Sequence, residues 1–364
     1  MSARIPITTD SRREPSGEVL LRARDVVKHF PVGGRSLRGM PRDMVHAVDG
    51  VSLDIYRGET VGVVGETGCG KSTLARCLTR LYDLTSGTLE FEGQDISTLS
   101  RREMRPFRRH MQMIFQDPYG SLNPRRRVGS IIGEPFAVHG LADGADRKRR
   151  VQQLMELVGL NPEHYNRFPA EFSGGQRQRI GVARALALRP KLIVCDEPVS
   201  ALDVSIQAQI INLLSDLQAE FNLTYLFIAH DLSVVQQVSN RVMVMYLGSV
   251  VEVAPADPLY ATPRHPYSAA LLSAAPVADP DLAESRERVV LMGDPPSPVH
   301  PPSGCRFHPR CPKALPDCSE MDPVLEPRLG DGPEHLAACH HPLADDERLP
   351  VGGAVEAGIP EEES

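Results

Sequence analysis

The chain has 364 residues, of which 41% are hydrophobic and 24% charged, and its formal net charge is −7. This composition excludes wholesale disorder, and the length allows one large domain with a smaller one. The negative charge disfavours a dedicated nucleic-acid binder, and no apolar run approaches the roughly 18–20 residues of a membrane-spanning helix.

The N-terminal third predicts a polar tail, then strands and a glycine-rich turn. Residues 1–18 lack the apolar core of a signal peptide, so we expect a flexible tail and no export. A strand pattern reaches a loop rich in Gly, Arg and Pro at 31–43. The apolar run 60–64 is typical of a strand buried on both faces of a parallel sheet. After the turn, apolar residues recur at helical spacing, at Leu74, Cys77, Leu78 and Leu81.

The middle of the chain predicts helices followed by more strands. Helical patterns dominate 117–189, notably at 151–160 and 177–188, and Pro190 stops the second of them. An amphipathic helix is expected around 206–217. Buried strands are expected at 192–195 and 224–229, and an antiparallel pair at 242–246 and 250–253. Alternating strands and helices predict a mostly parallel α/β sheet.

The sequence GETGCGKS, at 65–72, matches the phosphate-binding loop pattern in full. It separates the expected buried strand from a helix, whose positive end would face a phosphate. Lys71 would supply charge to the β- and γ-phosphates, and Ser72 a hydroxyl for Mg²⁺. The sequence therefore predicts ATP contacts from Gly65, Glu66, Thr67, Gly68, Cys69, Gly70, Lys71, Ser72 and Thr73.

Two carboxylates follow the expected strand 192–195. Asp196 would hold Mg²⁺ through water, and Glu197 would polarise the attacking water as a general base. Two acids at a strand end often only begin a loop, but beside a phosphate loop they predict a hydrolytic site.

A third motif narrows the class of protein. The sequence FSGGQRQRIGVARAL, at 172–186, resembles the signature of ABC-transporter ATPases, with Phe172 where that family usually has leucine. The resemblance implies a composite site, in which the phosphate loop of one subunit and the signature of a partner subunit enclose each ATP. It assigns further ATP contacts to Ser173, Gly174, Gly175 and Gln176.

The remaining family elements occur in order. Gln116 resembles the Q-loop glutamine, which contacts Mg²⁺ and the γ-phosphate and links the site to the membrane domains. Asp203 ends a segment, SALD, that resembles the D-loop of the dimer interface. His230 resembles the switch histidine at the γ-phosphate. Phe30 is the candidate for the aromatic side chain that stacks on adenine, with a core phenylalanine as the alternative.

The resemblance implies the α/β fold of a phosphate-loop (P-loop) NTPase. A mostly parallel central sheet would be joined by an antiparallel β subdomain, a helical subdomain at about 117–189 and an irregular, cysteine-containing extension. We expect the ABC ATPase domain at 19–262, the extension at 263–343 and an acidic disordered tail at 344–364.

The extension resembles that of dipeptide and oligopeptide importer ATPases, through RHPYSAALLSAAP at 264–276 and PSPVHPPSGCRFHPRCP at 296–312. The N-terminal third is most similar to the F-type ATPase of these importers. Such importers carry two different ATPases, two permeases and an extracytoplasmic solute-binding protein. The resemblance therefore implies a peripheral subunit at the cytoplasmic face of the cell membrane, with a second ABC ATPase beside it.

Two alternatives stay open on the sequence. Related ATPases serve importers of nickel, glutathione or other small solutes. An ABC ATPase that acts on nucleic acid would belong to a different class, but such proteins generally have two ATPase cores or long insertions and lack this extension. We therefore expect no direct nucleic-acid contact.

Four cysteines crowd the extension with the spacing C-x5-C-x6-C-x20-C, at Cys305, Cys311, Cys318 and Cys339. Without export, a disulfide framework is not expected. Thiolates select soft metals, so zinc, an iron–sulfur cluster and unligated thiols are the possibilities. The subfamily resemblance implies a [4Fe–4S] cluster that braces the proline-rich segment.

Another cysteine lies in the phosphate loop. Cys69 is close to the start of the expected helix, a position that lowers a thiol pKa. The sequence thus gives the hypothesis that alkylation of Cys69 inhibits the ATPase and that ATP protects it.

Overall fold

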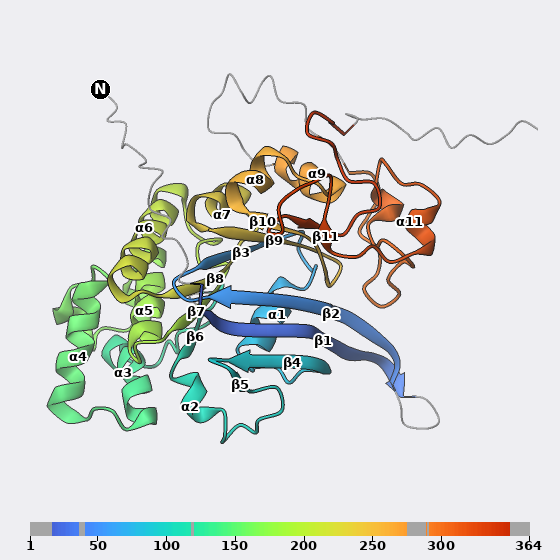
Figure 1. Ribbon diagram of the computed structural model, residues 1–364. Coiled ribbons are helices and arrows are strands. Elements are labelled where there is room, and N and C mark those ends of the chain that lie inside the picture. Colours follow the sequence, from blue (N-terminus) through green and yellow to red (C-terminus); the bar gives the residue numbers. More distant parts are fainter. Residues whose placement is uncertain (1–16, 36–40, 118–119, 275–288, 290, 350–364) are drawn as a thin grey trace, which may run out of the picture.

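The computed structural model describes residues 17–35, 41–117, 120–274, 289 and 291–349. Most of the two expected tails, 1–18 and 344–364, therefore lies outside the described residues. Two sheets and a layer of helices make up the molecule, and the C-terminal segment lies at one end of the larger sheet (Figure 1).

The larger sheet has eight strands in the order β11-β12-β10-β9-β3-β8-β7-β6. The five strands from β9 to β6 are parallel, and β10, β12 and β11 extend the sheet in antiparallel fashion. The prediction of a mostly parallel sheet with a late antiparallel pair is confirmed. The strand bounds are β3 (Thr60–Val64), β6 (Met111–Ile114), β7 (Leu192–Asp196), β8 (Thr224–Ile228), β9 (Arg241–Tyr246), β10 (Ser249–Pro255), β11 (Glu326–Pro327) and β12 (Leu336–Ala337).

The central strands are apolar throughout because both faces of the sheet are covered. All residues of β3, β7 and β8 are buried. Successive side chains point to opposite faces, so Val194 joins one apolar core while Ile193 and Cys195 join the other. This explains why the strands lack the polar alternation of a half-exposed sheet.

The smaller sheet is antiparallel, in the order β2-β1-β4-β5, and consists of β1 (Val19–Arg35), β2 (Pro41–Tyr56), β4 (Ser86–Phe91) and β5 (Gln94–Asp95). The loop predicted at 31–43 is wrong over most of its length, because Pro31 pairs with Met44 and Val32 with Asp43. Beyond Val27 strand β1 has no β4 partner, so Pro31 lies on a free edge where proline is tolerated.

The helices are α1 (Lys71–Leu78), α2 (Arg105–Arg108), α3 (Val128–His139), α4 (Gly144–Leu157), α5 (Gly174–Leu186), α6 (Val204–Phe221), α7 (Leu232–Val238), α8 (Ala256–Ala261), α9 (Pro266–Ala274) and α11 (Asp317–Glu320). Short 3₁₀ helices are η1 (Pro162–Asn166), η2 (Pro169–Glu171) and η3 (His308–Arg310). Helices α3, α4 and α5 group beside the sheet edge formed by β6 (Figure 1). Among the described residues, no helix has the length and apolarity needed to cross a bilayer.

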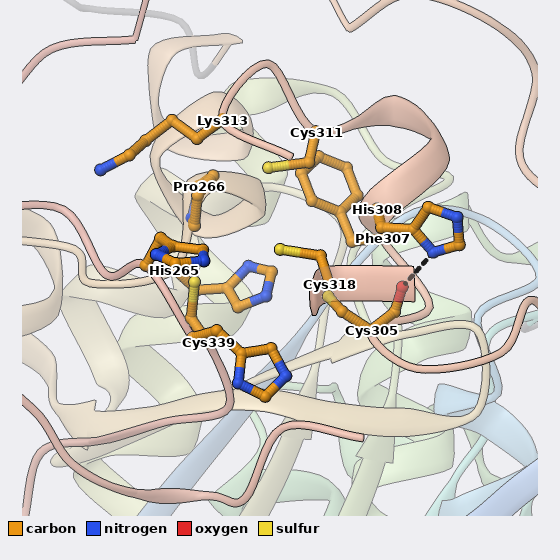
Figure 2. Close-up of a pocket in the computed structure, with 11 residues that line it drawn as sticks. His265, Pro266, Cys305, Phe307, His308, Cys311, Lys313, Cys318 and Cys339 are labelled. Atoms are coloured by element: carbon orange, nitrogen blue, oxygen red, sulfur yellow. Dashed lines mark hydrogen bonds between the residues drawn. The ribbon is translucent and has the colours of Figure 1, made fainter. Parts of the chain in front are cut away.

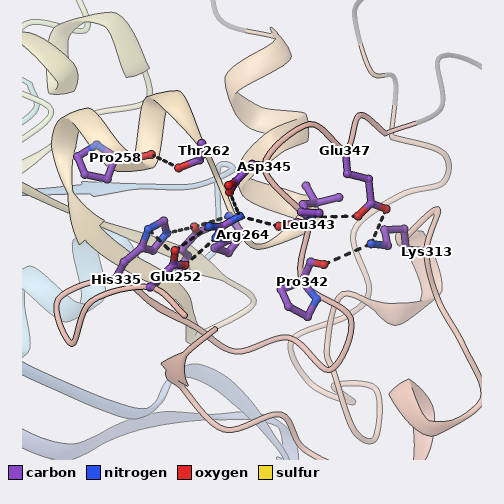
Figure 3. Close-up of polar contacts among 12 residues, drawn as sticks. Glu252, Pro258, Thr262, Arg264, Lys313, His335, Pro342, Leu343, Asp345 and Glu347 are labelled. Atoms are coloured by element: carbon purple, nitrogen blue, oxygen red, sulfur yellow. Dashed lines mark hydrogen bonds and ion pairs between the residues drawn. The ribbon is translucent and has the colours of Figure 1, made fainter. Parts of the chain in front are cut away.

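The described part of the extension is mostly irregular, as its proline content predicts, and a buried carboxylate anchors it. Glu252 on β10 is fully buried and accepts hydrogen bonds from the backbone N–H groups of Arg264 (2.7 Å) and His265 (2.9 Å). His335 Nε2, from the extension, lies 2.7 Å from the same carboxylate (Figure 3). The central sheet and the extension therefore share one polar cluster.

The side chain of Arg264 makes a second anchor. Its guanidinium donates to both oxygens of Asp331 at 2.6 Å and to the backbone oxygen of Leu343 at 3.0 Å. Asp345 lies 2.7 Å from the same group (Figure 3). The Arg264 side chain is 6% exposed and that of Asp331 is 14% exposed, so water screens the pair weakly.

Replacing Arg264 by methionine should lower the free energy of unfolding by about 3–5 kcal/mol, because Asp331 then loses its partner in a largely buried place. Urea unfolding of the full chain measures this loss. Arg22→Met is the control, since Arg22 pairs with Asp54 while 42% exposed and should cost less than about 1 kcal/mol. Equal losses in the two variants would contradict the anchoring role.

Candidate active site

The predicted catalytic side chains meet at one edge of the larger sheet. Strands β3, β8 and β7 are parallel neighbours, so their carboxyl ends lie side by side. The phosphate loop, residues 65–72, follows β3. Asp196 ends β7, and His230 follows β8 by two residues. A crevice at the carboxyl ends of parallel strands is where α/β proteins bind ligands.

The phosphate loop has a backbone path that glycine alone allows at two positions. Gly65 has φ of 151° and Gly70 has φ of 107°. A Cβ atom would come within 2.2 Å of the Met245 carbonyl oxygen at Gly65 and within 2.1 Å of the Ala47 carbonyl oxygen at Gly70. The loop is therefore wedged between β9 and β2.

The side chain of Lys71 forms hydrogen bonds with the backbone of the phosphate loop. Its side chain is buried, and Nζ donates to the backbone oxygens of Gly65 (2.7 Å) and Glu66 (2.9 Å). At the tip Thr67 and Gly68 are exposed, and Thr73 is half-buried on α1. The Lys71 ammonium group thus lies inside the phosphate loop, and the tip of the loop is exposed to solvent.

A hydroxyl and a carboxylate meet where α1 begins and β7 ends. Ser72 Oγ donates to Asp196 Oδ1 at 2.7 Å. Burial raises the pKa of Asp196, and the hydrogen bond from Ser72 opposes that shift. The 1% exposure of Asp196 leaves its carboxylate with little water to stabilise its charge.

Glu197 lies at the centre of a second contact. Gln116 Nε2 donates to Glu197 Oε2 at 2.7 Å, and His230 Nδ1 lies 3.7 Å from the same oxygen. The backbone of Glu197 has φ of 47°, which few non-glycine residues adopt, and its N–H donates to the oxygen of Ile228 at 2.9 Å. The strand edge thus brings the amide, the carboxylate and the imidazole together.

The signature segment, residues 173–176, caps α5. Ser173 Oγ accepts from the Gln176 N–H (3.3 Å), and Gln176 Oε1 accepts from the Ser173 N–H (3.0 Å). Both residues are exposed, while Gly174 is half-buried, and Phe172 packs into the core in place of the family's leucine. This reciprocal capping satisfies two backbone N–H groups at an exposed helix start.

The signature packs against the start of α6. A Cβ at Gly175 would come within 2.5 Å of Ile206 Cγ2, and Asp203 caps α6 by accepting from the Ile206 N–H at 3.0 Å. No hydrogen bond joins the signature to the phosphate loop in the part of the chain that the structure describes. The structure therefore groups the predicted site residues into two separate sets.

Phe30 lies on β1, outside both sets. Its ring is half-buried, with its centroid 5.5 Å from that of Tyr82 in an edge-to-face arrangement. Lys28 Nζ lies 5.0 Å from the Phe30 centroid. Phe30 is thus not part of the buried core, the alternative that the sequence left open.

The four cysteines of the extension line one pocket with Phe307 and His265 (Figure 2). Burial raises the pKa of Cys311 to about 11 and that of Cys339 to about 12, and it also raises the pKa of Cys305. No three of the four sulfur atoms, all in described residues, lie within 4.8 Å of one another.

One of these sulfurs also belongs to a tighter group. The sulfur of Cys318 lies within 4.8 Å of a carboxylate oxygen of Asp317 and a ring nitrogen of His341. His341 Nε2 is 2.9 Å from the Asp317 carboxylate, so these two groups already pair with each other.

Two contacts between the extension and the phosphate loop could not be predicted from local sequence patterns. The N–H of Glu66 donates to the Tyr267 hydroxyl at 2.8 Å, and Arg310 pairs with the Glu66 carboxylate at 2.9 Å. Tyr267 belongs to the HPY sequence of the extension, but no local pattern says that this tyrosine meets a residue 201 positions earlier.

The expectation of a lowered pKa at Cys69 is wrong. The residue is 5% exposed, and burial raises the pKa of its thiol, although Lys71 at 3.7 Å opposes the shift. The sequence argument considered only the nearby helix start. Removal of the thiolate from water outweighs that effect.

We therefore expect Cys69 to resist iodoacetamide at pH 7–8 in the native chain even without nucleotide. Mass spectrometry of the peptide that contains Cys69 measures the labelled fraction, and urea-unfolded protein provides the fully labelled reference. Rapid labelling of the native chain, with protection by ATP, would restore the original hypothesis.

Comparison with known proteins places the chain among transport ATPases. Residues 48–200 match the ABC transporter family, and residues 251–318 match the family described as oligopeptide/dipeptide transporter, C-terminal region. The chain is 54% identical to the oligopeptide transport ATP-binding protein AppF of Bacillus subtilis, over 89% of this chain and 97% of AppF. It is 49% identical to the di/tripeptide transport ATP-binding protein DppF of Pseudomonas aeruginosa, over 89% of this chain and 98% of DppF.

Solved structures agree with the fold. The ATP-binding cassette MJ0796, in a dimeric post-hydrolysis state with ADP and Pi, has a TM-score of 0.58 at 27% identity, over 65% of this chain and 98% of that one. The cbiO1 protein of Clostridium perfringens has a TM-score of 0.57 at 25% identity, over 67% of this chain and 91% of that one. The chain therefore belongs to the ABC-transporter ATPases, among the ATP-binding proteins of oligopeptide and dipeptide transporters.

Proposed function

We propose that this chain hydrolyses Mg·ATP to energise the import of dipeptides or oligopeptides by a membrane transporter. The meeting of Lys71, Ser72, Asp196 and Glu197 at one sheet edge carries the proposal. The relatives are named for transport of oligopeptides and of di/tripeptides, which favours peptides over nickel, glutathione or another small solute.

In this proposal the phosphate loop binds the triphosphate through its backbone N–H groups and Lys71. Mg²⁺ prefers oxygen ligands, and the Ser72 hydroxyl and Asp196 carboxylate offer two oxygens 2.7 Å apart. Burial raises the pKa of Asp196, and a divalent cation bound beside it would stabilise its charged form. Phe30, whose ring is half-buried on β1, would be the aromatic side chain that stacks on adenine.

Hydrolysis would use Glu197 as the general base. Water attacks the γ-phosphorus, the bond to the bridging oxygen of ADP breaks, and Glu197 accepts the proton of the water. Gln116 holds the same carboxylate through its amide, and His230 lies close enough to contact the γ-phosphate side of the site.

The exposed signature supports a composite site formed by two subunits. Ser173 and Gln176 are exposed at the start of α5, and no hydrogen bond among the described residues joins them to the phosphate loop of the same chain. The related cassette MJ0796 is dimeric with ADP and Pi bound. We infer that Ser173, Gly174, Gly175 and Gln176 meet the ATP of a second ABC ATPase subunit, and that Asp203 lies near the interface.

The remaining partners follow from the transport function. Residues 19–262 would form the motor domain, and residues 263–343 the peptide-importer extension. Two transmembrane permeases would bind the ATPase pair at the cytoplasmic face of the membrane, and an extracytoplasmic solute-binding protein would deliver the peptide. Identification of the ligand of that binding protein separates peptides from nickel, glutathione and other solutes.

Glu197→Gln should keep Mg·ATP binding but slow turnover on the order of 10²–10⁴-fold, because the general base is lost while the phosphate contacts remain. Phosphate release by the assembled transporter and equilibrium ATP binding measure the two effects. Lys71→Ala is the comparison variant and should weaken binding itself. Unchanged hydrolysis in Glu197→Gln would remove Glu197 from its proposed role.

We also propose that Cys305, Cys311, Cys318 and Cys339 hold a [4Fe–4S] cluster that braces the extension. A tetrahedral zinc ion with Zn–S bonds of about 2.3 Å would hold all four sulfurs about 3.8 Å from one another, and no three of these sulfurs lie within 4.8 Å of one another. Burial raises the pKa of three of these thiols, so a bound cation is needed to hold them as thiolates.

Protein purified without oxygen should contain about four iron atoms per chain, together with acid-labile sulfide. Elemental analysis measures the metal, and Cys339→Ser should lose most of it. Cys77→Ala is the matched control, because Cys77 is fully buried on α1 and should leave the iron content unchanged. Zinc in place of iron, or thiols without metal, would contradict this proposal.

A further inference from the structure

We propose that Arg310 is a positioning residue of the nucleotide site, whose guanidinium neutralises Glu66 so that the phosphate loop can accept a triphosphate. The inference rests on the proposed function, which makes residues 65–72 the triphosphate site. It adds a residue from the extension, outside the motor domain, to that site.

The contact is direct and largely buried. Arg310 Nη1 donates to Glu66 Oε1 at 3.1 Å and to Oε2 at 2.9 Å. The Arg310 side chain is 8% exposed and that of Glu66 is 26% exposed. Nη1 also lies 3.4 Å from the Tyr246 hydroxyl, so one cationic nitrogen holds three oxygen atoms.

The negative charge of Glu66 requires a positively charged partner if ATP is to bind at the phosphate loop. A carboxylate within the loop that binds phosphates repels the negative charge of ATP, and the repulsion is weakly screened where water is excluded. A cation held against that carboxylate cancels much of the repulsion. Arg310 is the group that the described structure places there.

Neighbouring contacts fix Arg310 and the loop relative to each other. Arg310 ends η3, and its backbone N–H donates to the oxygen of Phe307 at 3.0 Å. Phe307 packs on Tyr267, with ring centroids 5.3 Å apart, and Tyr267 accepts from the Glu66 N–H. The extension therefore holds Glu66 by its backbone and by its carboxylate.

The test measures KM and kcat for Mg·ATP in the full transporter, or Kd for Mg·ATP with the full-length chain. Arg310→Met keeps the bulk of the stem but removes the charge, and should raise KM roughly tenfold while kcat changes less than about threefold. Adding Glu66→Gln to Arg310→Met should recover KM to within about threefold of wild type, because the uncompensated carboxylate is gone.

Arg310→Lys should keep KM within about threefold of wild type, because a single nitrogen makes the contacts to Glu66. If Arg310→Met does not fold, Arg310→Gln gives the same contrast with Arg310→Lys. Arg328→Met is the matched control: Arg328 pairs with Glu326 inside the extension at 2.8 Å, and its loss should leave KM unchanged.

Two results would overturn the inference: a double variant as defective as Arg310→Met, or Arg310→Lys as defective as Arg310→Met or Arg310→Gln. Either would mean that charge at Glu66 is not what Arg310 controls. If the wild-type transporter itself releases no phosphate, the proposed function fails. If the wild-type transporter hydrolyses ATP but the variants do not show the expected changes in KM, only the inference about Arg310 fails.

Discussion

The contact between Ser72 and Asp196 depends on the parallel register of three strands. Because β3, β8 and β7 run in the same direction, the loop after β3 and the acids after β7 reach the same edge. The 2.7 Å hydrogen bond between these two residues joins the start of α1 to the end of β7. Glu197, Gln116 and His230 lie together at the same edge, so the chemistry follows from the sheet topology.

Buried polar contacts join the extension to the larger sheet. Its anchors are the buried Glu252 and the ion pairs of Arg264, which fix it beside β10. From that position Tyr267 and Arg310 reach Glu66 in the phosphate loop. Arg310 immediately precedes Cys311, so the segment that contacts the loop is also a segment of the four-cysteine pocket.

Local sequence patterns correctly predicted the structural features that are determined by residues close together in the sequence. The apolar runs identified β3, β7 and β8, and the glycine pattern identified the loop whose Gly65 and Gly70 have φ values near 151° and 107°. The sequence patterns could not predict properties that depend on contacts between residues far apart in the sequence. Strands β1 and β2 still pair at Pro31 and Val32, within a Pro/Gly-rich segment, because long-range pairing outweighs propensity. The pKa of Cys69 depends on burial by other elements, and the Arg310–Glu66 pair joins residues 244 positions apart.

The proposed function is tested by the rate of phosphate release from Mg·ATP when the chain is assembled with the partners proposed above, a second ATPase, two permeases and a solute-binding protein. We expect saturable release that requires Mg²⁺ and rises when the binding protein carries a peptide. A fully assembled complex that binds peptide but releases no phosphate from Mg·ATP would contradict the proposed function.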